Sequence, residues 1–242
     1  MRYWCAALIC LAVLAGTASA AGPACPVPDE LALGTIALPN SRTGIAEHGQ
    51  LIVLAIGGSS TAGSAAGGAA FTLPARLQEN LQAALPGVAI RVINHGRAGT
   101  ATRTMVTGLA DDIKATGAEL VIWGVGGVDA ALHEDVSSFT DSLQAGIEAA
   151  HQAGADILLI DPQYAPSIAR ILDLTPYRDA VQSAADAAGV TRLRRYELMQ
   201  SWSDDGVLDL DAGTPSDRVV VARHLYDCLA TVLANAIAES LR

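Results

Sequence analysis

A run of small and hydroxyl-bearing residues is the first place in this sequence where chemistry could occur. Gly57-Gly58-Ser59-Ser60-Thr61-Ala62-Gly63 directly follows an unbroken apolar run at 51–56. An apolar run that stops at glycines is typical of a strand buried on both faces. A serine at the carboxyl end of such a strand lies where open α/β sheets place their ligand sites. Ser59 is therefore a candidate nucleophile, and an ordinary Ser-rich turn is the alternative.

Two further glycine-rich loops follow predicted strands, at residues 94–100 and 126–128. The carboxyl ends of parallel strands share one edge of a sheet, so these loops and Ser59 should border one crevice. A serine nucleophile needs a base and donors for the developing oxyanion. A glycine amide can approach a substrate closely because no Cβ intervenes. Gly99 is the candidate oxyanion donor, with a simple turn glycine of positive φ as the alternative.

The elements that must position these loops alternate along the chain. Strands are expected at 51–56, 88–93, 120–125, 157–160 and 190–193, helices at 70–85, 102–116, 136–153, 168–188 and 219–241, and a loop at 203–217. Strands that alternate with helices of about ten or more residues imply βαβ units and a parallel sheet. The predicted fold class is α/β, a three-layer α/β/α sandwich with a five-stranded, mainly parallel sheet.

Composition narrows the class of protein and its partners. The 242 residues are 51% hydrophobic and carry a formal net charge of −10, with a single lysine, Lys114. Because no basic run exists, nucleic acid and anionic membrane surfaces are not expected partners. One domain is expected over 51–242, preceded at 21–50 by an extended arm that holds several of the ten prolines.

The first twenty residues have the pattern of a signal peptide. Arg2 precedes an apolar segment at 6–15, and Ala18-Ser19-Ala20 is a small-residue cleavage site. The apolar segment is too short to span a bilayer. We therefore predict removal of residues 1–20, export to a periplasmic or secreted location, and no membrane attachment afterwards; an uncleaved anchor is the alternative.

Four cysteines divide into two pairs. Cys5 and Cys10 would leave with the signal peptide, which leaves Cys25 and Cys228. An even number of cysteines in an oxidising compartment favours a disulfide, here between the N-terminal arm and the last helix. Two unpaired buried thiols are the alternative, because free cysteine is often buried.

The chain resembles the SGNH, or GDSL, hydrolases, and specifically an exported bacterial esterase-like branch, over nearly all of its mature length. Residues 57–63 resemble that family's first block, Gly-Asp-Ser-x-Thr-x-Gly, which implies Ser59 as the nucleophile. Residues 94–99 resemble the second block, Asn-x-Gly-x-x-Gly, which implies Gly99 as an oxyanion donor. The stretch 161–166 also resembles a segment that follows the fourth strand in this branch.

Two blocks depart from the family pattern. The third block is Gly-x-Asn, and Val128 stands here in place of its asparagine. The last block, Asp-x-x-His, is followed in this branch by Tyr-x-Cys-Leu-Ala, which stands here at 226–230. Counting back implies Asp217 as the acid and Val220 in place of the histidine; a gapped match would place Thr214 there. Loss of one oxyanion donor lowers the rate by about 10²–10³, and loss of a triad base lowers it further.

Three histidines are possible substitutes for the missing base. His224 lies one helical turn beyond Val220, and helical side chains lean toward the N-terminus of their helix. His95 lies in the second glycine-rich loop, and His133 follows the third. A lone histidine is more often structural or solvated than catalytic.

Neither a metal nor a cofactor is expected. Asp129 and His133 stand four residues apart, but two such residues are weak evidence for a metal site. Without a histidine to orient, Asp217 could instead cap the last helix.

The sequence leaves two principal hypotheses. The first is an exported carboxylic-ester hydrolase, an acyl or O-acetyl esterase, that uses Ser59 on a small acylated substrate or glycan and is weakened by Val128 and Val220. The second is a catalytically inactive descendant that binds an acylated glycan or an envelope protein. A structural envelope protein without a ligand is a third, weaker alternative.

Overall fold

The computed structural model describes residues 25–242, so the predicted signal peptide at 1–20 lies outside the described residues. The strands are β1 (Gln50–Ile56), β2 (Ala89–Asn94), β3 (Leu120–Gly124), β4 (Asp156–Ile160) and β5 (Thr191–Leu193). They form one sheet in the order β2-β1-β3-β4-β5, and every neighbouring pair is parallel. In this register Val53 of β1 lies opposite both Val92 and Leu120. The predicted five-stranded α/β fold is confirmed.

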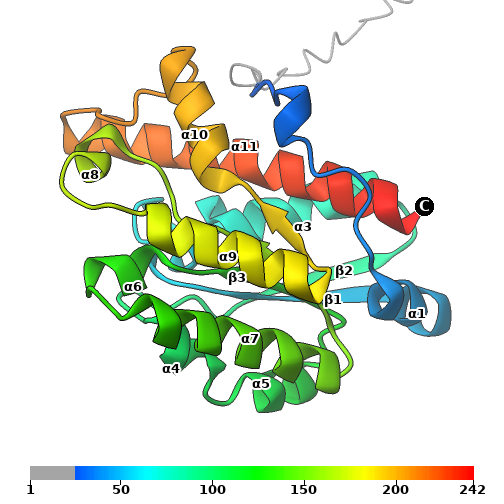
Figure 1. Ribbon diagram of the computed structural model, residues 1–242. Coiled ribbons are helices and arrows are strands. Elements are labelled where there is room, and N and C mark those ends of the chain that lie inside the picture. The colour runs from blue at the N-terminus through cyan, green and yellow to red at the C-terminus, as the bar shows by residue number, and fades with distance from the viewer. Residues whose placement is uncertain (1–24) are drawn as a thin grey trace, which may run out of the picture.

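Helices cover both faces of the sheet (Figure 1). They are α1 (Pro39–His48), α2 (Ser59–Ala62), α3 (Leu73–Ala84), α4 (Thr102–Val106), α5 (Leu109–Thr116), α6 (Gly127–Ala131), α7 (Val136–Gln152), α8 (Pro166–Ala169), α9 (Thr175–Ala188), α10 (Arg195–Asp204) and α11 (Pro215–Leu241). Helices α3, α10 and α11 lie on one face, and α5, α7 and α9 lie on the other. No helix within residues 25–242 is long and apolar enough to cross a membrane.

The interior strand β1 shows why the sequence of this strand is an unbroken apolar run. Leu51 and Val53 pack into the core beneath α3 and α11, whereas Ile52 and Leu54 pack into the core beneath α5, α7 and α9. Successive side chains of a strand point to opposite faces. Because both faces are covered, every position of β1 after Gln50 is buried and apolar.

The outer edge of the sheet is bonded to side chains of α3. The Oε1 atom of Gln78 accepts a hydrogen bond from the Val92 amide at 2.8 Å, and that of Gln82 accepts one from the Ile90 amide at 3.2 Å. Gln82 also donates through Nε2 to the Val88 carbonyl at 2.9 Å. Two glutamines one helical turn apart therefore satisfy the Ile90 and Val92 amides, which face away from β1.

The segment at 21–50 is less extended than expected, because it contains α1. Both oxygens of Asp156, which opens β4, bind the first turn of this helix. The Ser41 amide and hydroxyl donate to Oδ2 at 2.8 and 2.7 Å, and the Asn40 amide donates to Oδ1 at 3.1 Å. The helix was not evident from the sequence because its capping carboxylate lies 115 residues away.

Three helical expectations also need correction. The helix expected at 102–116 is divided into α4 and α5 at Gly108, whose φ of 84° is left-handed. The helix expected at 168–188 is divided into α8 and α9. Helix α11 begins at Pro215, inside the expected loop, because the Thr214 hydroxyl caps its first turn.

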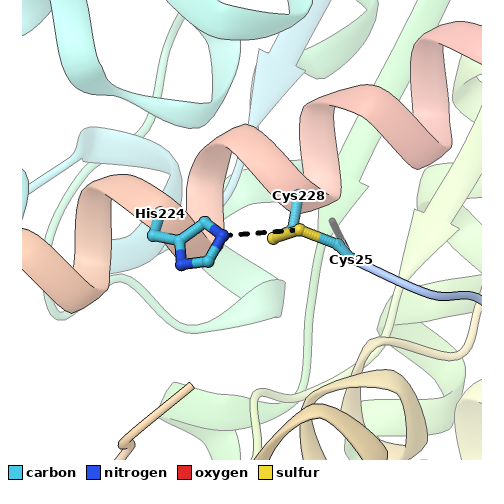
Figure 2. Close-up of side chains that lie close together, drawn as sticks. All are labelled: Cys25, His224 and Cys228. Atoms are coloured by element: carbon cyan, nitrogen blue, oxygen red, sulfur yellow. Dashed lines mark hydrogen bonds between the residues drawn. A yellow bond between two sulfur atoms is a disulfide. The ribbon is translucent and has the colours of Figure 1, made fainter. Parts of the chain in front are cut away.

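A disulfide joins the beginning of the described chain to the middle of α11. Cys25 and Cys228 are bonded with their Cα atoms 5.6 Å apart, within the limit of about 7 Å for an unstrained bridge. Figure 2 shows the His224 imidazole, also on α11, beside this bridge, with Nε2 3.7 Å from the Cys25 Sγ. The predicted pairing is present.

Candidate active site

Three predicted site residues line one cavity. Ser59, Gly99 and Val128 contribute to a cavity of about 390 Å³. They follow β1, β2 and β3 respectively, so the cavity opens at the carboxyl ends of neighbouring parallel strands. This is the edge at which open α/β sheets bind their ligands.

The backbone around Ser59 is held by the second glycine-rich loop. Asn94 donates through Nδ2 to the Thr61 carbonyl at 3.0 Å, and its Oδ1 accepts the Gly96 amide at 2.8 Å. A Cβ added to Gly96 would lie 2.3 Å from the Ala62 nitrogen, so the loop and α2 approach more closely than a side chain allows. Asn94 and Gly96 therefore position the helix that begins with the exposed Ser59.

Gly99 has a geometry compatible with either predicted role. Its φ is 72°, the left-handed region that favours glycine, and a Cβ added there would meet no atom within 4 Å. It is thus a turn glycine that also lines the cavity near Ser59. The space around it leaves its backbone open to a ligand.

Val128 brings a methyl group to the position where the family pattern has an amide. It lies on α6, and its Cγ2 would be 3.2 Å from a Cβ added to Gly58. The next residue, Asp129, is buried and accepts from the Thr102 amide at 2.9 Å and from its hydroxyl at 2.8 Å. The third block therefore joins α6 to α4 through Asp129, while Val128 presents only hydrocarbon to the cavity.

The last block does not reach this cavity. Asp217 lies in the first turn of α11, where its amide donates to the Thr214 hydroxyl at 3.2 Å and its carboxylate accepts from that hydroxyl at 2.6 Å. The Thr214 hydroxyl therefore caps the helix, and the Asp217 carboxylate holds that hydroxyl in place, so the capping role expected of Asp217 belongs to Thr214. Val220 is 65% exposed, and neither residue lines the cavity. The catalytic role that the resemblance implies for Asp217 has no geometric support in this structure.

None of the three substitute histidines lines the cavity either, within the part of the chain that the structure describes. His224 contacts the disulfide (Figure 2). His95 Nδ1 lies 3.3 Å from Asp112 Oδ2, and His133 is exposed in a turn with φ of 53°. The described cavity therefore offers a serine hydroxyl without an imidazole beside it.

The one basic residue among the described residues that line the cavity was not predicted from the sequence. Arg195, the first residue of α10, is only 5% exposed, and its Nη1 donates to the Ser60 hydroxyl at 2.9 Å. Burial lowers the pKa of its guanidinium, and the charges of Asp161 and Tyr226 oppose that shift. The concentration of arginines at 192, 194 and 195 in an acidic protein is the sequence signal that could have drawn attention to it.

A buried ion-pair cluster lies beside Arg195 at the ends of β4 and β5. Asp161 is fully buried, pairs with Arg192 at 2.7 Å and accepts the Tyr196 amide at 3.0 Å. Burial raises the pKa of Asp161 to about 6, against the opposing effect of Arg192. Arg178 pairs with Glu197 at 2.8 Å. These contacts fix the beginning of α10, and thereby Arg195, against the sheet.

The described residues contain one group of three potential metal ligands, formed by Cys25, His224 and Cys228. Both sulfur atoms belong to the disulfide, and a metal ligand must be a thiolate. In its oxidised form this group therefore links the arm to α11 and does not present a set of metal ligands.

A parallel sheet in the order 2-1-3-4-5, with a serine after β1 and glycine-rich loops around it, is the arrangement of the SGNH, or GDSL, hydrolases. A family model described as the non-GDSL lipase-like family matches residues 24–242. The chain belongs to this family. Its first block indeed has Gly58 where the GDSL pattern has an aspartate.

Solved structures share the fold. A lipase/acylhydrolase from Enterococcus faecalis is 22% identical, with a TM-score of 0.62 over 79% of this chain and 97% of that one. An acetylxylan esterase from Geobacillus stearothermophilus is 20% identical, with a TM-score of 0.59 over 77% of this chain and 94% of its own. A comparison with curated proteins finds no match.

Proposed function

We propose that this protein is an exported ester hydrolase of low activity in which Ser59 attacks the acyl carbonyl of a small acylated substrate or glycan. The observation that supports the proposal is that Ser59 and Gly99 line one cavity of about 390 Å³ at the carboxyl edge of the sheet. Family membership and the esterase named among the structures with this fold point in the same direction.

The proposed reaction has two steps. The Ser59 oxygen forms a bond to the acyl carbon, the ester C–O bond breaks, and the alcohol leaves with the proton from the serine. Water then attacks the acyl carbon, releases the carboxylic acid and returns a proton to Ser59. Backbone amides at Ser59 and Gly99 would hold the oxyanion in both steps.

Two features keep the expected rate low. Water must accept the serine proton, because no histidine lies among the described lining residues. The Val128 side chain has no hydrogen-bond donor to offer the oxyanion. Serine hydrolases stripped of their triad retain a rate about 10³–10⁴-fold above that in water, from the oxyanion hole and substrate binding alone. Activity of that order is the expectation here.

The absence of a histidine from the described residues that line the cavity favours a second candidate function. The protein would then bind an acylated glycan or an envelope protein partner at the same cavity without turnover. Ser59 and the glycine loops would in that case maintain the shape of the site.

The two functions differ in how Ser59 reacts. We would incubate the purified protein with a serine-directed phosphonate probe and measure p-nitrophenyl acetate hydrolysis in parallel. Ser59→Ala should abolish labelling and hydrolysis, whereas Ser64→Ala, an exposed serine five residues along the same segment, should leave both unchanged. Labelling and turnover that depend on Ser59 support the hydrolase, and their absence in the folded wild type supports the binding protein.

A further inference from the structure

Arg195 has an unusual environment for a buried cation. The side chain is 5% exposed. Among the described residues it forms a single hydrogen bond, from Nη1 to the Ser60 hydroxyl. Its Nε atom is buried and has no acceptor among residues 25–242. A guanidinium carries five N–H donors and stays protonated in proteins. Most of its hydrogen-bonding capacity therefore remains unused.

Neighbouring carboxylates form no ion pair with this guanidinium, although the charge of Asp161 acts on it beyond ion-pair distance. The buried acid of the cluster, Asp161, is paired with Arg192 at 2.7 Å and also accepts the Tyr196 amide. Both oxygens of Asp129, the acidic residue that lines the cavity, accept from Thr102. Within the described chain Arg195 forms no ion pair, and burying an unpaired charge is strongly unfavourable.

The position of Arg195 identifies what could pair with it. The residue lines the same cavity as Ser59 and Ser60, so a molecule inside that cavity can reach the guanidinium. Carboxylate and phosphate oxygens match the planar guanidinium fork and form short, charge-assisted hydrogen bonds with it. Such a ligand would also accept from the Ser60 hydroxyl.

We propose that Arg195 and Ser60 form a binding site for an anionic group, so that the ligand of this cavity is an anionic molecule that carries a carboxylate or a phosphate. This deepens the proposed function and rests on it for one step, namely that the anionic ligand is also the ester presented to Ser59. The site would then select acylated molecules that bear a negative charge over neutral esters of similar size.

Thermal unfolding of the mature protein tests anion binding without reference to hydrolysis. The probes are succinate and inorganic phosphate at constant ionic strength, with succinamide as the neutral match for succinate. For a chain of this size, saturation to about a hundred times Kd should raise Tm by roughly 5 °C or more. The anion that gives the larger rise in Tm shows whether the site prefers a carboxylate or a phosphate.

Two variants assign the effect to this site. Arg195→Met removes the buried charge, so the ligand-free protein should unfold at an equal or higher Tm and should no longer respond to the anion. An arginine with a merely structural role would give a lower Tm. In the wild type, Arg195 Nη1 lies 2.9 Å from the Ser60 oxygen. Ser60→Asp places a carboxylate of the protein beside this Nη1, so it should also abolish the rise in Tm with the anion. Arg91→Gln, an exposed arginine on β2, is the matched control and should respond like the wild type.

The outcomes separate this inference from the proposed function. A shift that is lost in Arg195→Met or in Ser60→Asp supports the site even if no ester is hydrolysed. A shift of equal size in all variants, or no shift in the wild type, overturns it. Hydrolysis of p-nitrophenyl acetate with no preference for p-nitrophenyl hemisuccinate would uphold the hydrolase and refute the anionic ester as its substrate.

Discussion

The Cys25–Cys228 disulfide should contribute a large part of the stability of this protein. Its two cysteines are separated by 203 residues in sequence, so the bond closes nearly the whole described chain into one loop. In the chain-entropy account, a loop of this length removes denatured-state freedom equivalent to about 5 kcal/mol. Removal of a native disulfide from a small secreted domain typically lowers the free energy of unfolding by about 2–5 kcal/mol.

Urea unfolding with and without dithiothreitol measures this contribution. Reduction should lower the free energy of unfolding by about 2–5 kcal/mol, or Tm by roughly 5–15 °C for a chain of this size. The Cys25→Ala/Cys228→Ala double variant should match the reduced wild type and should not respond to the reductant. Equal unfolding midpoints for oxidised and reduced wild type would refute the reasoning, because they would show that α11 and the arm need no covalent link.

Three further predictions follow from the site and from α1. Val128→Asn should raise p-nitrophenyl acetate turnover by up to about 10²-fold, because it supplies a side-chain oxyanion donor. Val220→His should leave turnover unchanged, because that position is exposed outside the cavity. A large gain from Val220→His alone would show that α11 reaches Ser59. In urea unfolding, Gly96→Ala should destabilise the protein by about 1–3 kcal/mol through its clash with the α2 backbone. Gly99→Ala should destabilise it by about 1 kcal/mol through backbone strain alone. A larger loss of unfolding free energy in Gly99→Ala than in Gly96→Ala would contradict the packing described. Asp156→Ala should lower the free energy of unfolding by about 3 kcal/mol or more, because it leaves buried donors of α1 without an acceptor. It should also speed proteolytic cleavage on the N-terminal side of β1. Cleavage at the wild-type rate would show that α1 is held by other contacts.

The elements that were predicted correctly are those with a strong local signal. The apolar run at 51–56 specifies a strand buried on both faces because each residue in it packs against helices. The glycine-rich loops after the first three strands led to the cavity, because parallel strands must bring their carboxyl ends to one edge. These features could be predicted because the pattern of residues within one segment is enough to indicate a buried strand and the loop at its carboxyl end.

The elements that were missed depend on partners far away in sequence. Helix α1 has little apolar periodicity, and its first turn is capped by Asp156 of β4. The position of Arg195 was not evident because a charged residue is expected to be exposed. Its burial follows from the way α10 packs beside the pair formed by Asp161 and Arg192. The resemblance to the family's last block also placed Val220 at the site, whereas the structure leaves that residue in solvent on the first turns of α11.

The hydrogen bonds from β2 to Gln78 and Gln82 have a consequence for how this protein behaves among copies of itself. An uncovered edge strand offers a row of free amides that can recruit a strand from another molecule and begin aggregation. Here the outward amides of Ile90 and Val92 are already bonded within the chain. The opposite edge, β5, is only three residues long. Within its described residues the chain therefore presents no long row of unbonded strand amides to another copy of itself.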